Sequence, residues 1–248
     1  MYLWKCWRDS RARFLSFLVI AIAVGMLSAW IGVETTRQQV TRTFVRGRGV
    51  EMIRNSDAWM LAVVGLISIA APLMVVVGAT FGVVGVGDEL ERGSGSFLLT
   101  RPRRRRHFVW TAAALGWLEL FAFVCLLSLA TFGMLCYYTR EVATWRVFAP
   151  IPGLFVLGML CHGLAQALAT AGRNTRNAVY GTFAFALAYP LTVTWIRIAL
   201  HWRIPTPTEM VYPWPGPAEI HLVPMFGWLA VALVFPLIQQ LIVERVEV

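Results

Sequence analysis

Long apolar stretches alternate with short polar ones along the whole chain. The apolar stretches cover residues 14–33, 58–87, 108–138, 151–171, 178–200 and 222–243. Each is long enough for a transmembrane helix, which needs roughly 20 apolar residues, and none alternates between polar and apolar positions as the strands of a membrane β-barrel do. The pattern therefore predicts an all-α integral membrane protein with six transmembrane helices, which form a single domain over residues 1–248.

Composition and charge support a membrane protein and exclude one class of partner. Hydrophobic residues make up 58% of the chain and charged residues 14%, whereas about 25% of the residues of a soluble domain are charged. In a membrane protein the net charge of +9 is explained by basic residues that flank the helices on the inner side, so no nucleic-acid partner is expected. The first apolar stretch lacks a clean small-x-small cleavage site, and we expect an uncleaved anchor instead of a signal peptide.

The distribution of basic residues predicts the orientation of the chain. With six helices, both termini lie on one side, and most of the 22 lysines and arginines then fall on that side, which the positive-inside rule makes cytoplasmic. Residues 34–57 are predicted to form an outer loop with at most a short helix. The proline-rich outer loop of residues 201–221 is interpreted either as a rigid cap or re-entrant hairpin, or as a stiffened connector.

The amino-terminal residues 1–13 have one apolar helical face. Leu3, Trp4, Trp7 and Phe14 share that face, and charged residues occupy the opposite one. Because tryptophans prefer the headgroup level, this segment is predicted to form an amphipathic interfacial helix, or elbow helix, ahead of the first transmembrane helix. The alternative is a basic flank that only fixes the orientation of the first span.

No motif predicts a nucleotide, haem or metal site on this chain. The sequence GVVGVG at residues 82–87 has the wrong order for a dinucleotide-binding loop, and no P-loop sequence occurs. Its small residues are interpreted as allowing close helix packing. Only His162 of the four histidines falls within an apolar stretch, and the four cysteines show no C-x-x-C spacing. We therefore expect no metal and no cofactor on the chain itself.

Two polar residues inside apolar stretches are candidate functional residues. Glu119 is the only carboxylate near the middle of a stretch, where a charge costs about 2.5–3.5 kcal/mol even on lenient insertion scales. Glu119 either lines a substrate pathway or joins helices through a hydrogen bond. Gln166, in the fourth stretch, is a second pathway candidate, for which helix joining is the favoured interpretation.

The polar segment of residues 88–106, DELERGSGSFLLTRPRRRR, separates the second and third apolar stretches. Its glycines permit a reversal of chain direction, and Phe97, Leu98 and Leu99 form a short apolar patch. Pro102 is expected to end any helix, and the four arginines that follow hold the third span at the anionic inner surface. The segment is interpreted either as a cytoplasmic element that offers its apolar patch to a partner, or as an ordinary inner loop.

The order of these residues resembles the signature of the permeases of type-2 ATP-binding-cassette transporters. In that family an E-x-G-[ST] element is followed by a leucine pair, a proline and basic residues ahead of the third span. The matching positions are Glu91, Gly93, Ser94, Leu98, Leu99, Pro102 and Arg105, with Glu89 and Phe97 beside them. The six stretches, the amphipathic start and the long outer segment before the last span are also similar to the family, whereas the run of four arginines departs from it.

The resemblance implies a permease subunit in a bacterial or archaeal cytoplasmic membrane, an exporter of a lipid-like, amphipathic or drug-like substrate. Such a subunit forms a dimer with itself or with a related subunit, and binds separate ATPase subunits that hold ATP and magnesium. Residues 88–106 would be the coupling segment that docks on the ATPase, and the chain would not itself be an enzyme. The alternative function is a non-transporting membrane anchor or scaffold subunit of a larger respiratory or assembly complex.

Overall fold

In the computed structural model the chain is described over residues 2–45, 55–84, 86–91, 102–139, 145–200 and 222–245, and these ranges contain helices and turns but no strand. The long helices are α1 (Tyr2–Val45), α2 (Asn55–Gly82), α5 (Pro102–Thr139), α6 (Ile151–Gly172), α7 (Thr175–Leu200) and α8 (Leu222–Arg245). The short ones are α3 (Val86–Glu91) and the 3-10 helix η1 (Trp145–Phe148). Within the described part of the chain, six helices are long and apolar enough to cross a membrane. The predicted all-α fold with six membrane helices is confirmed.

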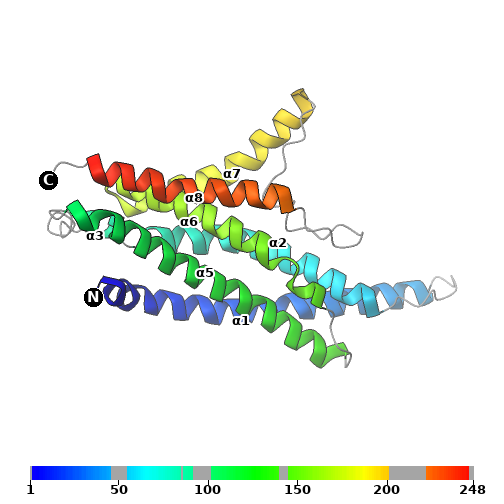
Figure 1. Ribbon diagram of the computed structural model, residues 1–248. Coiled ribbons are helices and arrows are strands. Elements are labelled where there is room, and N and C mark those ends of the chain that lie inside the picture. The colour runs from blue at the N-terminus through cyan, green and yellow to red at the C-terminus, as the bar shows by residue number, and fades with distance from the viewer. Residues whose placement is uncertain are drawn as a thin grey trace.

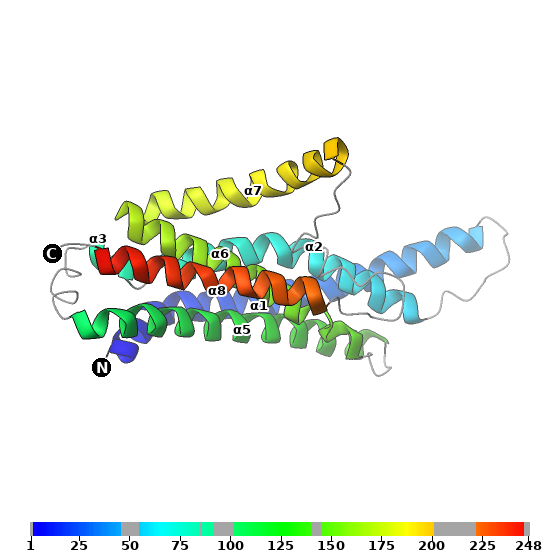
Figure 2. The same cartoon turned by 45° about the horizontal axis from the view of Figure 1, so that its top comes forward.

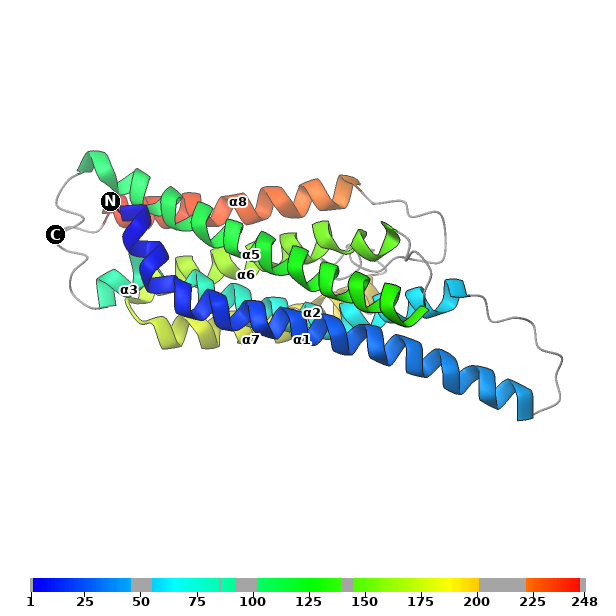
Figure 3. The same cartoon turned by 90° about the horizontal axis from the view of Figure 1, so that it is seen from below.

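The long helices lie side by side and run in alternating directions. The start of α1, the end of α8, α3 and the start of α5 all lie at one end of the bundle, here called the terminal end (Figures 1 and 3). Helix α6 packs against α2, α5, α7 and α8 and is the most deeply buried span. Helix α7 diverges from the other helices toward its carboxyl end and is the least buried span (Figures 1 and 2). The cytoplasmic location of the terminal end stays a prediction.

Helix α1 includes both the amphipathic start and the first span without a break in the helix. Its first turns run at an angle to the rest of the helix (Figure 3). The rings of Trp7 and Phe14 meet at a centroid distance of 5.5 Å, as expected for residues on one helical face. A separate elbow helix is therefore not seen among residues 2–45, and the location of residues 1–13 in the membrane interface stays a prediction.

The boundaries of the polar segments differ from those expected at three places. Helix α1 continues to Val45 and α2 begins at Asn55, so most of the loop expected over residues 34–57 is helical, because the sequence ETTRQQVTRTFV contains no glycine or proline to end a helix. The second helix ends at Gly82, followed by a turn, instead of running to residue 87. Pro102 was expected to end a helix but begins α5. Proline is suited to the first helical position because the backbone N–H that it lacks would have no partner within the helix there.

Glycines allow helices to approach closely at two interfaces. On α2, a Cβ atom added at Gly78 would lie 2.7 Å from the carbonyl oxygen of Gly158 on α6, and one added at Gly82 would collide with the carbonyl oxygen of His162. On α1, a Cβ atom added at Gly25 would lie 2.6 Å from the carbonyl oxygen of Leu127 on α5. Small residues permit such backbone contact between membrane helices. The close-packing role expected for the glycines of residues 82–87 is confirmed at Gly82.

Candidate functional site

An apolar cavity of about 510 Å³ lies among helices α2, α6, α7 and α8. Aromatic side chains line it from two helices: Phe183, Phe185 and Tyr189 from α7, and Trp228 and Phe235 from α8. The rest of the lining comes from α2 and α6 and is aliphatic apart from Cys161, and none of the lining residues is charged. The volume is typical of small-molecule sites, which range from roughly 300 to 1,000 Å³. The cavity is thus large enough for a ligand but offers no partner for a charge.

Ring contacts connect the two aromatic helices of this cavity. The rings of Phe185 and Tyr189 stack at a centroid distance of 5.8 Å along α7, and the edge of Tyr189 meets Trp228 of α8 at 5.7 Å. Pro72 of α2 and Pro190 of α7 are both interior to their helices and both line the cavity. Because a proline inside a helix removes one backbone hydrogen bond, both helices have an interrupted hydrogen-bond pattern where they line the cavity.

Glu119 lies outside this cavity, in the contact between α1 and α5. Its side chain is only 4% exposed, and its Oε1 accepts a hydrogen bond of 2.6 Å from the hydroxyl of Ser10. Ser10 is the first residue of the apolar span of α1, so the carboxylate lies at the level of one end of that span and not at its middle. A space of about 10 Å³ beside the two side chains can hold about one water molecule. The hydrogen bond favours helix joining, and the pathway role of Glu119 stays a prediction.

Gln166 belongs to a row of buried polar side chains on α6. His162, Gln166 and Thr170 follow one another at intervals of four residues, and each is about 1% exposed. Gln239 of α8 donates a hydrogen bond of 2.9 Å from its Nε2 to the Thr170 hydroxyl. The side-chain amide of Gln166, by contrast, has no hydrogen-bond partner among the described residues. Helix joining, expected of Gln166, is therefore done by Thr170 and Gln239, and Gln166 does not line the apolar cavity.

A carboxylate of the predicted coupling segment is bound to the start of α7. Glu91, at the end of α3, accepts a hydrogen bond of 2.9 Å at its Oε2 from the backbone N–H of Thr175, the first residue of α7. Asn174 accepts another, of 3.1 Å, at its side-chain oxygen from the backbone N–H of Asn177. Both acceptors satisfy N–H groups that have no partner within a helix, and a negative charge is favourable at a helix amino terminus. The chain before residue 92 is thereby fastened to α7.

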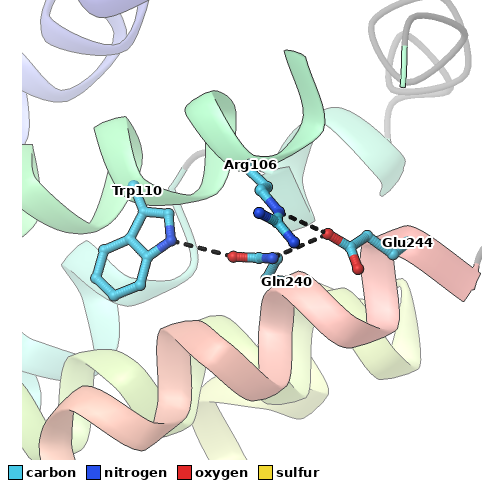
Figure 4. Close-up of polar contacts among 4 residues, drawn as sticks. All are labelled: Arg106, Trp110, Gln240 and Glu244. Atoms are coloured by element: carbon cyan, nitrogen blue, oxygen red, sulfur yellow. Dashed lines mark hydrogen bonds and ion pairs between the residues drawn. The ribbon is translucent and has the colours of Figure 1, made fainter. Parts of the chain in front are cut away.

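A second polar cluster fastens the start of α5 to the end of α8 (Figure 4). The Arg106 Nε–H donates to the carboxylate of Glu244 over 3.2 Å. Gln240 donates to the same carboxylate oxygen over 2.9 Å and accepts a hydrogen bond of 3.2 Å from the indole N–H of Trp110. Neither Glu244 nor Gln240 was predicted from the sequence, although polar residues at the end of the last apolar stretch were a usable signal.

The remaining coupling residues fall into two groups. Gly93, Ser94, Phe97, Leu98 and Leu99 lie outside the described residues. Glu89 is half-buried within α3, and Pro102 and Arg105 belong to the first turn of α5. Residues 92–101 are thus followed by the start of α5, whose Arg106 binds Glu244 of α8, and preceded by Glu91, which binds the start of α7.

The described ranges contain no group of three or more His, Cys, Asp and Glu residues that could hold a metal ion. Comparison with protein-family models finds no match to the chain. No curated protein and no solved structure is significantly similar to it. The six long apolar helices in the described part of the chain define its class as a multi-pass membrane protein.

Proposed function

We propose that this chain is the membrane-spanning permease subunit of an ATP-binding-cassette transporter that exports a lipid-like, amphipathic or drug-like substrate. The observation that carries the proposal is the order of residues 88–106, which follows the type-2 permease signature in the position between the second and third spans. Its partners are a separate ATPase subunit and a second permease subunit, in a bacterial or archaeal cytoplasmic membrane with both termini inside. ATP and magnesium are held by the ATPase.

Two structural observations support the proposal. Residues 92–101 are bordered by contacts to α7 and α8, and these helices supply the aromatic wall of the apolar cavity. A force applied to this segment therefore acts on two helices of a site that suits an apolar substrate. The absence of a P-loop sequence agrees with ATP hydrolysis on a partner chain.

The test is recovery of the ATPase subunit with the detergent-extracted chain, together with ATPase activity in membranes. Leu98→Asp and Phe97→Asp each place a charge in the docking contact and should weaken assembly while membrane insertion survives. Loss of a buried interface anchor costs about 2 kcal/mol or more, which is a factor of about 30 in affinity. Arg104→Ala is the control, since an exposed ion pair is worth about 0–1 kcal/mol.

Equal recovery of the ATPase with Leu98→Asp, Phe97→Asp and the parent chain would refute the coupling role of this segment. The isolated chain is expected to hydrolyse no ATP. Recovery of redox subunits in place of an ATPase would instead support the membrane-anchor function.

A further inference from the structure

We propose that the cavity among α2, α6, α7 and α8 is a binding site, within a single subunit, for the hydrocarbon chain of a membrane lipid. Binding at this site needs no ATPase and can be tested without one. Transport of the bound molecule is a further step that rests on the proposed function.

The side chains that line the cavity favour an apolar occupant. Seventeen residues line the cavity, and the polar side-chain atoms among them are limited to the Tyr189 hydroxyl, the Trp228 indole N–H and the Cys161 thiol. A charged headgroup would be buried there without an opposite charge, which is strongly unfavourable. Water needs two to four polar partners to occupy a cavity, and this lining does not supply them. A hydrocarbon chain needs none.

An empty cavity would be energetically unfavourable. Lining atoms that face an empty space lose their van der Waals contacts on that side, and the space is about 510 Å³. All the lining residues lie within the apolar spans of the four helices, and those of α2, α6 and α7 lie well inside them, at the depth where a bilayer supplies hydrocarbon chains. The membrane itself therefore provides the matching occupant.

A hydrocarbon chain can enter the cavity from the surrounding membrane beside helix α7. Two of its lining residues are also strongly exposed, Phe185 by 54% and Leu187 by 72%, so the cavity continues to the outer surface of the bundle. Ala184 and Ala188, one turn apart, are exposed and do not line the cavity, which defines the opposite face of α7. A lipid can insert one chain while its headgroup stays at the membrane surface.

The experiment is photo-crosslinking of the purified full chain with a phosphatidylcholine that carries a diazirine on one acyl chain. The protein is incubated with this lipid and washed extensively in detergent to remove lipid from its outer surface. It is then irradiated and digested for peptide mapping. Retained label is expected on cavity-lining peptides of α6, α7 and α8. Covalent label per chain is the quantity compared between variants.

Two matched pairs of substitutions decide the outcome. Ala186→Trp fills the cavity from α7, and Ala184→Trp adds the same side chain on the opposite face. Val231→Trp fills it from α8, and Val234→Trp is its control at similar exposure, 46% against 42%. Filling variants should lose label by about tenfold or more, the equivalent of 1.4 kcal/mol, and the controls should keep it. Size-exclusion chromatography identifies a misfolded variant, in which case the other pair decides.

Equal label in the filling and control variants of a folded pair would overturn the proposal. Absence of retained label from the parent chain would also overturn it. Label retained with no ATPase recovered would uphold the lipid site and refute the proposed transporter, so the two failures are distinguishable.

Discussion

Replacing a glycine by alanine should have opposite effects on stability inside the α2–α6 contact and at an open position on α5. Gly78→Ala places a Cβ atom 2.7 Å from the carbonyl oxygen of Gly158 and 2.9 Å from the Cβ atom of Cys161. Neither is the end of a flexible side chain, so the two helices must separate until the first distance reaches the ordinary contact of about 3.4 Å. Gly133→Ala on α5 is the control, since a Cβ atom there meets nothing within 4 Å.

The expected magnitudes follow from two opposing terms. Overpacking a close contact costs about 1–3 kcal/mol, and replacing a helical glycine by alanine stabilises by roughly 0.5–1 kcal/mol. Gly78→Ala should therefore lower the free energy of unfolding by about 0–2.5 kcal/mol, whereas Gly133→Ala should raise it by roughly 0.5–1 kcal/mol. Each kcal/mol corresponds to about 2–4 °C in Tm for a chain of this length.

The assay is thermal unfolding in detergent, followed by circular dichroism and by recovery of monodisperse chain after heating. Gly78→Ala should unfold several degrees below Gly133→Ala under identical conditions. An equal or higher Tm for Gly78→Ala would show that the α2–α6 contact is not rigid, and the close-packing argument would fail.

Five further substitutions test the polar residues. Gln166→Leu should raise Tm, because it removes a buried amide without a partner in the described structure, whereas Gln239→Leu should lower it by breaking a hydrogen bond; the reverse order would contradict this. Ser10→Ala should cost about 1.5–3 kcal/mol, as expected for a hydrogen bond to a carboxylate, and Glu119→Gln should keep the fold but change transport if the carboxylate lines the pathway. Unchanged transport with a lowered Tm would instead assign Glu119 to helix joining. Arg106→Ala should change Tm little, since its side chain is 73% exposed.

Sequence patterning predicted the six helices because each apolar stretch is long, uninterrupted and apolar on all faces. It failed over residues 34–45, where charged and polar side chains suggested a loop but the helix continues to Val45. Polarity shows where a helix leaves the membrane, but a helix can continue beyond that point where no glycine or proline interrupts it. The glycines that follow Phe81 accordingly mark the actual end of α2.

The apolar cavity could not be predicted from the sequence. Its lining residues, such as Val75 and Leu164, are of the same types as those that face lipid on the outside of any membrane helix. Only the packing of four helices brings them together. Glu119 and Gln166 were recognisable because a polar residue is costly in an apolar stretch, but the identity of a partner such as Ser10 depends on the crossing of α1 and α5.

The four walls of the cavity are not equally free to move. Gly78 and Gly82 bring α2 against the backbone of α6, so these two walls cannot slide or close further without a collision. Helix α8 is also held to α6, by the hydrogen bond between Gln239 and Thr170 and by the close approach of Phe235 to Gly163. Helix α7 meets α8 through the aromatic contact described above, and its start is joined to Glu91 beside residues 92–101. On the proposed function, a force on that segment therefore changes the cavity by moving α7, the least buried span, against the other three helices. A hydrocarbon chain bound in the cavity opposes or favours the same movement. By linkage, the ATPase and the bound hydrocarbon chain each change the binding free energy of the other by the same amount.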